Sequence, residues 1–327
     1  MISVIIPTRN RADMLGATMT SFLKQGKLPA DYEVIIVDNG STDNTSDVIK
    51  SFERKNSRIK SFSAVEPGLH TGRHVGLKNA NFENLVFIDD DIEVGKFWLS
   101  SIVAAFEKPD VKMVAGDVLP KFMTEPPDWI FDLWHNRLTS GNRMLWPLSI
   151  IEFLDKAEAI DPAFVFGCNF PVRKSLVLEA GGFNPDALPK DMMRFRGDGE
   201  TKIARYCRAK KYKCRFSAGA SIWHKVPKGR MTKDYFYNRG FSEGISKSFS
   251  ELRYGETLRS KFRRIGHPIL EKLYSRHLGT EAAEIVRALH VGERLGRKYH
   301  RTAYYGDKEV QEWVRKEDFL TKTTQNV

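Results

Sequence analysis

The sequence predicts an α/β fold, in which a mostly parallel sheet is flanked by helices and followed by a C-terminal helical region. Short apolar runs alternate with helix-prone segments through the N-terminal third of the chain, which is the order that a doubly wound parallel sheet requires. Beyond about residue 235 the pattern becomes helical. We therefore expect a main domain over residues 1–245 and a helical appendage over residues 246–327.

Four apolar runs are expected to form neighbouring strands. Each is short, continuous and rich in β-prone residues, as in a strand that is covered on both faces. The carboxyl ends of such strands form the edge of the sheet where ligands bind, and two of these runs lead directly into aspartates. The runs lie at residues 2–6, 33–38, 59–65 and 85–88, with helices expected to about residues 24, 55 and 80 and over 95–106.

The middle of the chain is expected to be less regular. Residues 111–119, 163–170 and 213–216 have the composition of further strands, whereas residues 120–148 are rich in proline and polar residues. Three tryptophans in this last segment can form a stacking platform for a sugar or a membrane-facing lip, or they can fill the core under a long loop. They are Trp129, Trp134 and Trp146.

The length of the chain indicates a large core, and its cysteine content indicates a reducing compartment. The chain has 327 residues, 41% of them hydrophobic, and can bury a large core. No apolar run approaches the ~18 residues of a membrane span, and the N-terminus enters a strand pattern without the features of a signal peptide. Three cysteines without a CxxC spacing argue against a disulfide framework or zinc knuckle. A cytoplasmic location is expected.

The net charge of +11 is concentrated in one stretch. Residues 201–240 hold twelve Lys and Arg against one acid, Asp234, which accounts for the whole excess. A local basic field favours an anionic ligand such as a phosphate, or peripheral attachment to the anionic inner face of a membrane. Nucleic acid is not an expected partner, because the charge is confined to these forty residues.

Asp89, Asp90 and Asp91 follow the fourth apolar run directly. Three adjacent carboxylates repel one another unless they are solvated or paired with a cation, and hard oxygen ligands suit Mg²⁺ or Mn²⁺. Alternation along an extended segment would point Asp89 and Asp91 the same way, with Asp90 opposite. The triplet therefore indicates a divalent-metal site, with a solvated acidic turn as the alternative.

Other polar residues stand next to predicted helix starts. Asp198 and Glu200 lie in a glycine-rich loop before a helix, where the helix N-terminus favours an ionised carboxylate and suits either a general base or an ordinary cap. Gly72 can let backbone amides approach a phosphate, and Arg73 would add a fork of donors, although glycines can also simply make turns.

Several motifs together resemble the family 2 glycosyltransferases of bacterial polysaccharide and glycan biosynthesis, whose nucleotide-sugar-binding domain has the GT-A fold. The resemblance covers roughly residues 1–245, and the order and spacing of the motifs make it specific. The motifs are PTRNR at 7–11, VDNGSTD at 37–43, GLHTGRHVG at 68–76, FIDDDI at 87–92, then GCNF, GGF, GDGE and WHKV at 223–226.

The resemblance implies a role for particular residues. Pro7, Thr8 and Arg9 would line the nucleotide pocket and Asp38 would hydrogen-bond the base. The acidic motif would bind the nucleotide sugar through Asp89 and Asp90 and the metal through Asp91, with Asp89 and His224 as further metal ligands. The family's base sits in a Glu-Asp pair at a helix start; here Gly199 splits the pair, and counting back from the helix end near Tyr212 favours Glu200 over Asp198.

The function implied is that of a metal-dependent, inverting hexosyltransferase. Its donor would be a nucleoside-diphosphate sugar, a UDP-sugar first, and its acceptor a hydroxyl of a glycan or a lipid-linked glycan. Mn²⁺ or Mg²⁺ would neutralise the leaving group, and Glu200 or Asp198 would take the acceptor proton. The alternative is a non-catalytic nucleotide-sugar-binding or scaffold protein on the same fold. A nucleotidyltransferase is disfavoured, because PTRNRADM is not a glycine-rich loop.

Overall fold

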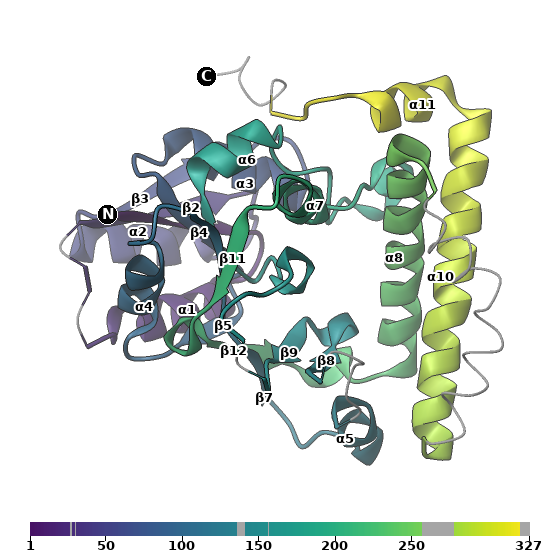
Figure 1. Ribbon diagram of the computed structural model, residues 1–327, viewed down its shortest axis with the longest axis horizontal. Coiled ribbons are helices and arrows are strands. Elements are labelled where there is room, and N and C mark those ends of the chain that lie inside the picture. Colours follow the sequence, from purple (N-terminus) through teal and green to yellow (C-terminus); the bar gives the residue numbers. More distant parts are fainter. Residues whose placement is uncertain (27, 30, 136–140, 156, 257–277, 321–327) are drawn as a thin grey trace.

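The chain forms two β-sheets and a pair of long C-terminal helices that lie side by side (Figure 1). The computed structural model of the chain describes residues 1–26, 28, 29, 31–135, 141–155, 157–256 and 278–320. None of the helices in these ranges is both long enough and apolar enough to cross a bilayer.

The larger sheet confirms the predicted mostly parallel architecture. Within the described residues its strands are β1 (Ile2–Thr8), β2 (Tyr32–Asp38), β3 (Ile59–Ser63), β4 (Asn84–Ile88), β6 (Val111–Ala115), β10 (Asn169–Arg173) and β11 (Lys213–Phe216). They lie in the order β11-β6-β10-β4-β1-β2-β3. Strand β10 runs antiparallel to β4 and β6, whereas the other neighbouring pairs are parallel.

Helices cover the larger sheet, so its central strands are apolar at successive positions. All seven residues of β1 are buried, and so are the last four of β4. The helices before residue 233 are α1 (Ala12–Leu23), α2 (Thr45–Lys55), α3 (Leu69–Asn79), α4 (Trp98–Ala105), α5 (Asp128–Trp134), α6 (Lys174–Glu179) and α7 (Thr201–Ala209). Short 3₁₀ turns are η1 (Trp146–Leu148), η2 (Pro162–Phe164), η3 (Lys190–Phe195), η4 (Ala218–Ala220) and η5 (Lys228–Arg230).

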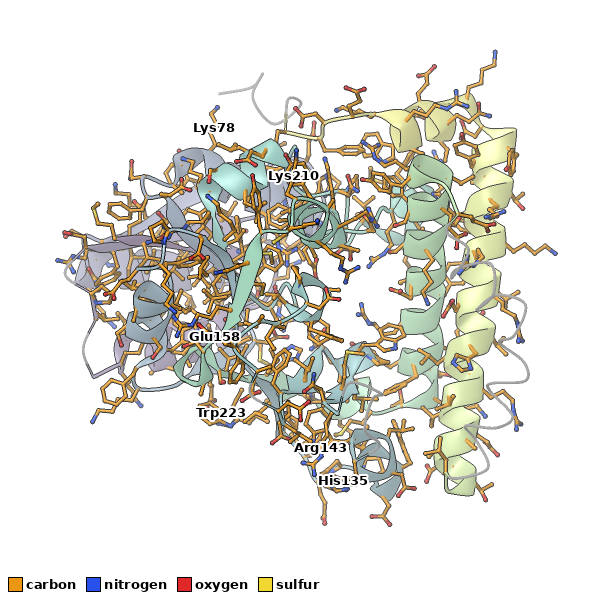
Figure 2. All side chains as sticks on the ribbon, viewed as in Figure 1. Lys78, His135, Arg143, Glu158, Lys210 and Trp223 are labelled. Atoms are coloured by element: carbon orange, nitrogen blue, oxygen red, sulfur yellow. The ribbon has the colours of Figure 1, made fainter. Side chains whose placement is uncertain are left out.

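A second, smaller sheet brings distant segments to the end of β4. Its strands are β5 (Ile92–Val94), β7 (Val118–Phe122), β8 (Arg143–Leu145), β9 (Ile150–Glu152) and β12 (Ile222–Val226), in the order β5-β12-β7-β9-β8. Strand β12 pairs with β5, and His224 lies opposite Ile92. Alternation along β12 buries His224 and leaves the neighbouring Trp223 43% exposed at the rim of the molecule (Figure 2).

The C-terminal region is helical, as predicted. Helices α8 (Lys233–Tyr254) and α10 (Thr280–Gly306) pack along one another, and α11 (Lys308–Arg315) crosses their end (Figure 1). Glycines let the two backbones approach closely, because a Cβ on Gly244 or Gly296 would collide with the facing helix backbone. The expected boundary at residue 245 lies inside α8. Residues 257–277 and 321–327 of the expected appendage lie outside the described residues.

Two expected strands are wrong in their bounds. Residues 111–119 are divided between β6 and β7, which belong to different sheets. Gly116 lies between the two strands and packs against the backbone of Ala220, where a Cβ would collide. The expected strand over residues 163–170 begins only at Asn169. Before it, Asp161 accepts the Ala163 N–H at 3.0 Å and caps the turn η2.

Trp129 and Trp134 fill the core. Both lie on α5 and are only 3% and 7% exposed, and Trp129 packs edge-on against Phe236 of α8 with ring centroids 5.2 Å apart. Trp146 is partly buried and packs against the main core. The core alternative therefore applies to the first two, and neither offers a face to a sugar.

Candidate active site

A cavity of about 490 Å³ opens at the carboxyl ends of β1, β2 and β4. This is the edge at which open α/β sheets bind ligands. Six predicted site residues line it: Pro7, Thr8, Arg9, Asp89, Asp90 and Asp91. Among the other residues of its wall are Arg11, Asn39, Arg230 and the segment Ala187 to Pro189.

Asp90 is bound to the end of β1. Its Oδ2 accepts a hydrogen bond from the Thr8 hydroxyl at 2.6 Å, and its Oδ1 lies 2.7 Å from Nε of Arg11. Burial raises the pKa of Asp90 to about 7, although Arg11 and Thr8 oppose the rise. The Asp90 carboxyl therefore ties the cavity floor to the end of β1, and its burial makes its ionisation unfavourable.

Asp91 is the most strongly paired acid of the triplet. Its Oδ2 accepts hydrogen bonds from Arg11 Nη2 and Arg230 Nη2, both at 2.7 Å. Burial opposes ionisation, but the guanidinium groups of Arg230 and Arg11 help to hold the pKa of Asp91 well below its ordinary value. Asp91 is therefore a carboxylate under all ordinary conditions.

Asp89 and Asp91 make different direct contacts. Arg11 bridges Asp90 and Asp91, while the side chain of Asp89 is 33% exposed and lies 3.7 Å from Arg73. Strand β4 ends at Ile88 and the triplet forms a turn, so the orientation of Asp89 and Asp91 toward one ligand stays a prediction.

The Nε2 atom of His224 lies beside the acidic triplet. Its Nδ1 lies 2.8 Å from the carbonyl oxygen of Leu148, which can only accept, so Nδ1 carries the proton. Its Nε2 lies 3.0 Å from Nη1 of Arg230, which can only donate, and 3.3 Å from Oδ1 of Asp91. The ring is therefore the neutral Nδ1–H tautomer with Nε2 directed at Asp91, which is the form that ligates a metal.

Two of the expected metal ligands, Asp91 and His224, lie together at the site. Oδ1 of Asp91 is buried and makes no hydrogen bond with any residue that the structure describes, and it lies 3.3 Å from Nε2 of His224. A carboxylate oxygen and an imidazole nitrogen are donors that suit Mn²⁺ and related ions, so these two side chains fit part of the coordination of a divalent cation. In the described part of the chain no three acidic, histidine or cysteine side chains converge as a finished cluster, and Arg230 contacts both Asp91 and His224.

Glu200 lies at the start of α7, as expected. Its Oε1 accepts the Gly167 N–H at 3.0 Å and its Oε2 accepts Arg73 Nη1 at 3.1 Å, while its side chain stays 24% exposed. Arg73 is 2% exposed, and its Nη2 donates to the Gly167 carbonyl at 3.2 Å and lies 3.7 Å from Asp89. One guanidinium therefore joins the expected base to the acidic triplet.

Asp198 has a different role. Its buried carboxylate accepts hydrogen bonds from Asn184 at 2.6 Å, Arg205 at 2.8 Å and Ser250 at 2.6 Å. These contacts tie the start of α7 to α8. Of the two candidate bases, the geometry favours Glu200.

Asp38, Gly72 and Arg73 lie behind the cavity wall. Asp38 ends β2 and accepts the Ser41 N–H at 2.9 Å, next to Asn39 in the wall. A Cβ on Gly72 would lie 3.0 Å from Cβ of Pro7, so this glycine lets α3 pack on β1. The expected phosphate fork of Arg73 is directed at Glu200 and Gly167 instead.

Two cations were missed as site residues. Arg11 closes the motif PTRNR, and Arg230 lies six residues beyond His224 in the basic stretch. The sequence does indicate that such cations exist, because three adjacent carboxylates require nearby cations when they are buried. Which of the many arginines supply them depends on contacts across 80 and 139 residues of sequence.

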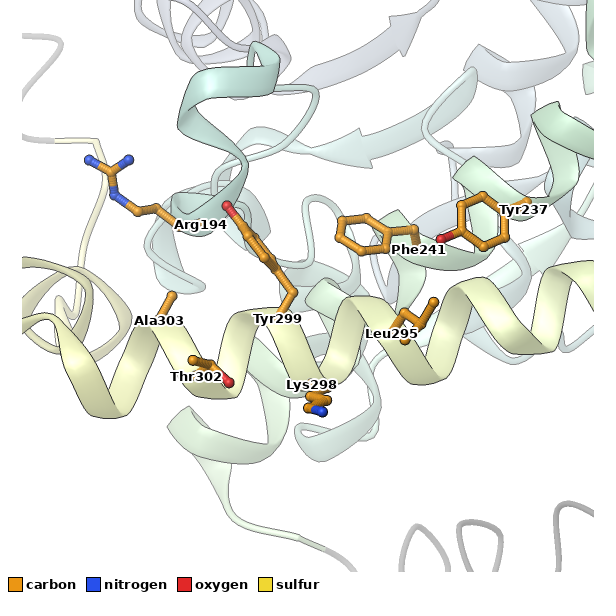
Figure 3. Close-up of a pocket in the computed structure, with 8 residues that line it drawn as sticks. All are labelled: Arg194, Tyr237, Phe241, Leu295, Lys298, Tyr299, Thr302 and Ala303. Atoms are coloured by element: carbon orange, nitrogen blue, oxygen red, sulfur yellow. The ribbon is translucent and has the colours of Figure 1, made fainter.

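A second cavity, of about 590 Å³, lies against α8 and α10 (Figure 3). Its described lining is mainly aromatic and aliphatic and includes no acidic residue. The lining residues are Arg194, Tyr237, Phe241, Leu295, Lys298, Tyr299, Thr302 and Ala303. It therefore lacks the ligands of a metal and diphosphate site, and the cavity at the acidic triplet is the candidate active site.

Comparison with known proteins places the chain among glycosyltransferases. The model of the family Glycosyl transferase family 2 matches residues 3–180. A validoxylamine A glucosyltransferase from Streptomyces hygroscopicus subsp. limoneus is 35% identical over 119 residues, which are 36% of this chain and 26% of that protein. An uncharacterized glycosyltransferase from Nostoc sp. is 31% identical over 176 residues, 49% of this chain and 54% of that one. The matches thus span about a quarter to a half of these relatives' lengths.

Among solved structures, a mannosyltransferase from Pyrobaculum calidifontis in complex with GDP-Man and Mn²⁺ is similar over 98% of this chain and 85% of that one. The TM-score is 0.55 at 18% identity, which supports the GT-A fold and does not extend to specificity. The family match covers more than half of the chain and includes the cavity floor and the acidic triplet. The chain belongs to glycosyl transferase family 2.

Proposed function

We propose that the protein transfers a sugar from a nucleoside-diphosphate donor to an acceptor hydroxyl, with inversion and with the help of a divalent cation. The observation that carries the proposal is the arrangement of the acids around Arg73. This guanidinium lies 3.1 Å from Glu200 at the start of α7 and 3.7 Å from Asp89 on the cavity wall. A base and a metal-binding triplet are thereby held on one rigid unit.

Each residue has a defined task in this reaction. Glu200 takes the proton of the acceptor hydroxyl while its oxygen bonds to the anomeric carbon and the bond to the diphosphate breaks. The bonding electron pair leaves with the diphosphate, and a single displacement inverts the anomeric configuration. Asp91, Asp89 and His224 would hold a divalent ion, which would supply charge neutralisation for the leaving diphosphate.

The donor's nucleotide would lie along the ends of β1 and β2. Pro7, Thr8 and Arg9 line the cavity there, and Asn39 next to Asp38 brings polar groups to its edge. The base that a donor carries is decided by these few side chains. A UDP-sugar is the first donor to test, with GDP- and dTDP-sugars beside it.

The acceptor is proposed to be a hydroxyl of a glycan or a lipid-linked glycan. The expected anionic membrane surface has less support from the fold than from the sequence, because six of the twelve basic residues in 201–240 pair with acids. Lys202 and Lys225 are buried as well, whereas Lys210 remains exposed (Figure 2). Half of the basic residues in this stretch are therefore paired with acids within the fold.

The test is a transfer assay with UDP-, GDP- and dTDP-sugars, Mn²⁺ or Mg²⁺ and a panel of hydroxyl acceptors. Release of the nucleoside diphosphate and the mass of the product are followed together. A glycosylated product whose anomeric configuration is opposite to that of the donor supports the proposal. Tight donor binding without any product across the panel would instead favour a nucleotide-sugar-binding protein.

A further inference from the structure

Arg230 contacts both of the side chains that a cation would bridge, Asp91 and His224, whose Oδ1 and Nε2 atoms lie 3.3 Å apart. Its Nη2 donates to Oδ2 of Asp91 at 2.7 Å, and its Nη1 donates to Nε2 of His224 at 3.0 Å. The side chain is 22% exposed and forms part of the cavity wall. One guanidinium thus uses a carboxylate oxygen and an imidazole lone pair that both belong to the candidate metal site.

His224 cannot accept a hydrogen bond from Arg230 and coordinate a metal ion at the same time. Because Nδ1 of His224 is committed to the Leu148 carbonyl at 2.8 Å, Nε2 has a single lone pair in the ring plane. That lone pair either accepts from Arg230 or coordinates an ion. An ion bound by His224 and Asp91 would also place its charge against the guanidinium, so Arg230 has to withdraw before the ion can enter.

The segment that carries Arg230 is suited to such a movement. Arg230 ends η5, a single 3₁₀ turn that follows β12. Within it Lys228 and Gly229 are exposed, and no described heavy atom lies within 4 Å of where a Cβ on Gly229 would be. Asp91 also keeps Arg11 as a partner when Arg230 leaves.

We propose that Arg230 is an internal placeholder, which holds Asp91 and His224 when donor and metal are absent and moves to the donor's diphosphate when they bind. The inference rests on the proposed function, because it takes the ligand of the cavity to be a nucleoside diphosphate. The diphosphate supplies the negative charge that attracts the released guanidinium. Nucleotide and metal therefore strengthen each other's binding through Arg230, in addition to the attraction between the ion and the diphosphate.

The experiment measures Mn²⁺ binding to the full chain by the EPR signal of free Mn²⁺, with no turnover involved. Wild type is expected to bind Mn²⁺ weakly alone and roughly tenfold more tightly with saturating UDP or GDP, a typical size for coupled sites. Arg230→Met should bind Mn²⁺ roughly tenfold more tightly than wild type without nucleotide and should show a smaller coupling than wild type, once the Mn²⁺ that the nucleotide binds without protein is subtracted. Arg230→Lys, with one ammonium in place of the fork, should fall between them.

Lys228→Met is the matched control. It removes one positive charge from an exposed position of the same turn and is expected to leave the Mn²⁺ affinity unchanged. Equal Mn²⁺ affinity of wild type and a folded Arg230→Met variant would overturn the inference, as would an equal gain in Lys228→Met or no Mn²⁺ binding in any form. Failure of the inference is distinguishable from failure of the proposed function. A wild type that transfers sugar with Mn²⁺ but shows no coupling refutes the placeholder alone, and coupling without transfer refutes only the reaction.

Discussion

Arg73 Nη1 lies 3.1 Å from Glu200 Oε2, although the two residues are 127 positions apart in the sequence. The guanidinium is almost wholly buried, whereas the carboxylate reaches the surface of the site. The other end of the same fork holds the Gly167 carbonyl and lies near Asp89. Arg73 on α3 therefore positions the proposed base, Glu200, and also lies next to Asp89 of the acidic triplet.

Glu200→Gln should reduce transfer by about 10²–10⁴-fold, the usual effect of losing a positioned base. The amide keeps the shape, but its single oxygen can accept from only one of Gly167 and Arg73, and buried Arg73 loses its charged partner, so the melting temperature should fall as well. Asp198→Asn is the comparison: it removes a carboxylate that binds Arg205 and Ser250, so it should lower the melting temperature. The two variants are compared by initial rates and by thermal unfolding. Near-normal turnover of Glu200→Gln would exclude Glu200 as the base.

Arg73→Met should lower both stability and activity. Breaking a buried ion pair costs about 3–5 kcal/mol, and the lower end is expected here because Glu200 keeps its Gly167 hydrogen bond and part of its exposure. Urea unfolding gives the change in free energy. Arg9→Met offers a control arginine on the cavity wall, where a larger effect on donor KM than on stability is expected. If Arg73→Met proved as stable as wild type, the proposed positioning role would be wrong.

Asp90 should make the protein less stable as the pH rises from about 4 to 7. The pKa of Asp90 is raised to about 7 in the fold, so over this range the folded chain holds a proton that the unfolded chain has lost. The shift of about three units bounds the effect at ~4 kcal/mol. Asp90→Asn should flatten this part of the pH profile in urea unfolding with EDTA present.

The exposed Glu125, for which Glu125→Gln serves as control, should leave the profile unchanged. The buried His70, His74 and His300, whose pKa values burial lowers, contribute in the opposite direction over this range, so the test is the difference between the two profiles. A profile that Asp90→Asn does not alter would contradict the assignment of this proton to Asp90.

The helix pair α8 and α10 should depend on its glycines. A Cβ on Gly296 would overlap the Phe241 carbonyl of the facing helix, so Gly296→Ala should destabilise by about 1–3 kcal/mol or more. Gly306, at the end of the same helix, has no described atom near its Cβ position. Gly306→Ala should therefore be neutral or stabilise by ~0.4–1 kcal/mol. Thermal unfolding of the two variants checks the packing, and equal effects would contradict it.

Much of the sheet and of the cavity floor could be predicted from the sequence, because both depend on local signals. The runs ending at Thr8, Asp38 and Ile88 have continuous apolar patterns, and their carboxyl ends meet by topology alone. The antiparallel insertion of β10 depends instead on tertiary pairing with β4 and β6. No hydrophobic periodicity in the sequence predicts that β10 pairs antiparallel with these two strands.

The charge partners could not be predicted for the same reason. Asp198 looks like half of an acidic pair until Ser250 and Arg205 are seen to surround it. Strand alternation could not predict the contacts of the triplet, because the strand ends one residue before Asp89. Arg230 resembled one charge among twelve in its stretch, and only the fold brings it to Asp91.

The measurement that tests the central claim most directly is thermal unfolding of wild type and Asp91→Asn against UDP-, GDP-, dTDP- and CMP-sugars, with Mn²⁺ and with EDTA. A ligand at about 100 times its Kd stabilises the native state by ~2.7 kcal/mol, which is readily seen. The account predicts that one nucleotide sugar raises the melting temperature of wild type with Mn²⁺, and that both EDTA and Asp91→Asn abolish the shift. No shift with any donor, or a shift that persists in Asp91→Asn, would contradict it.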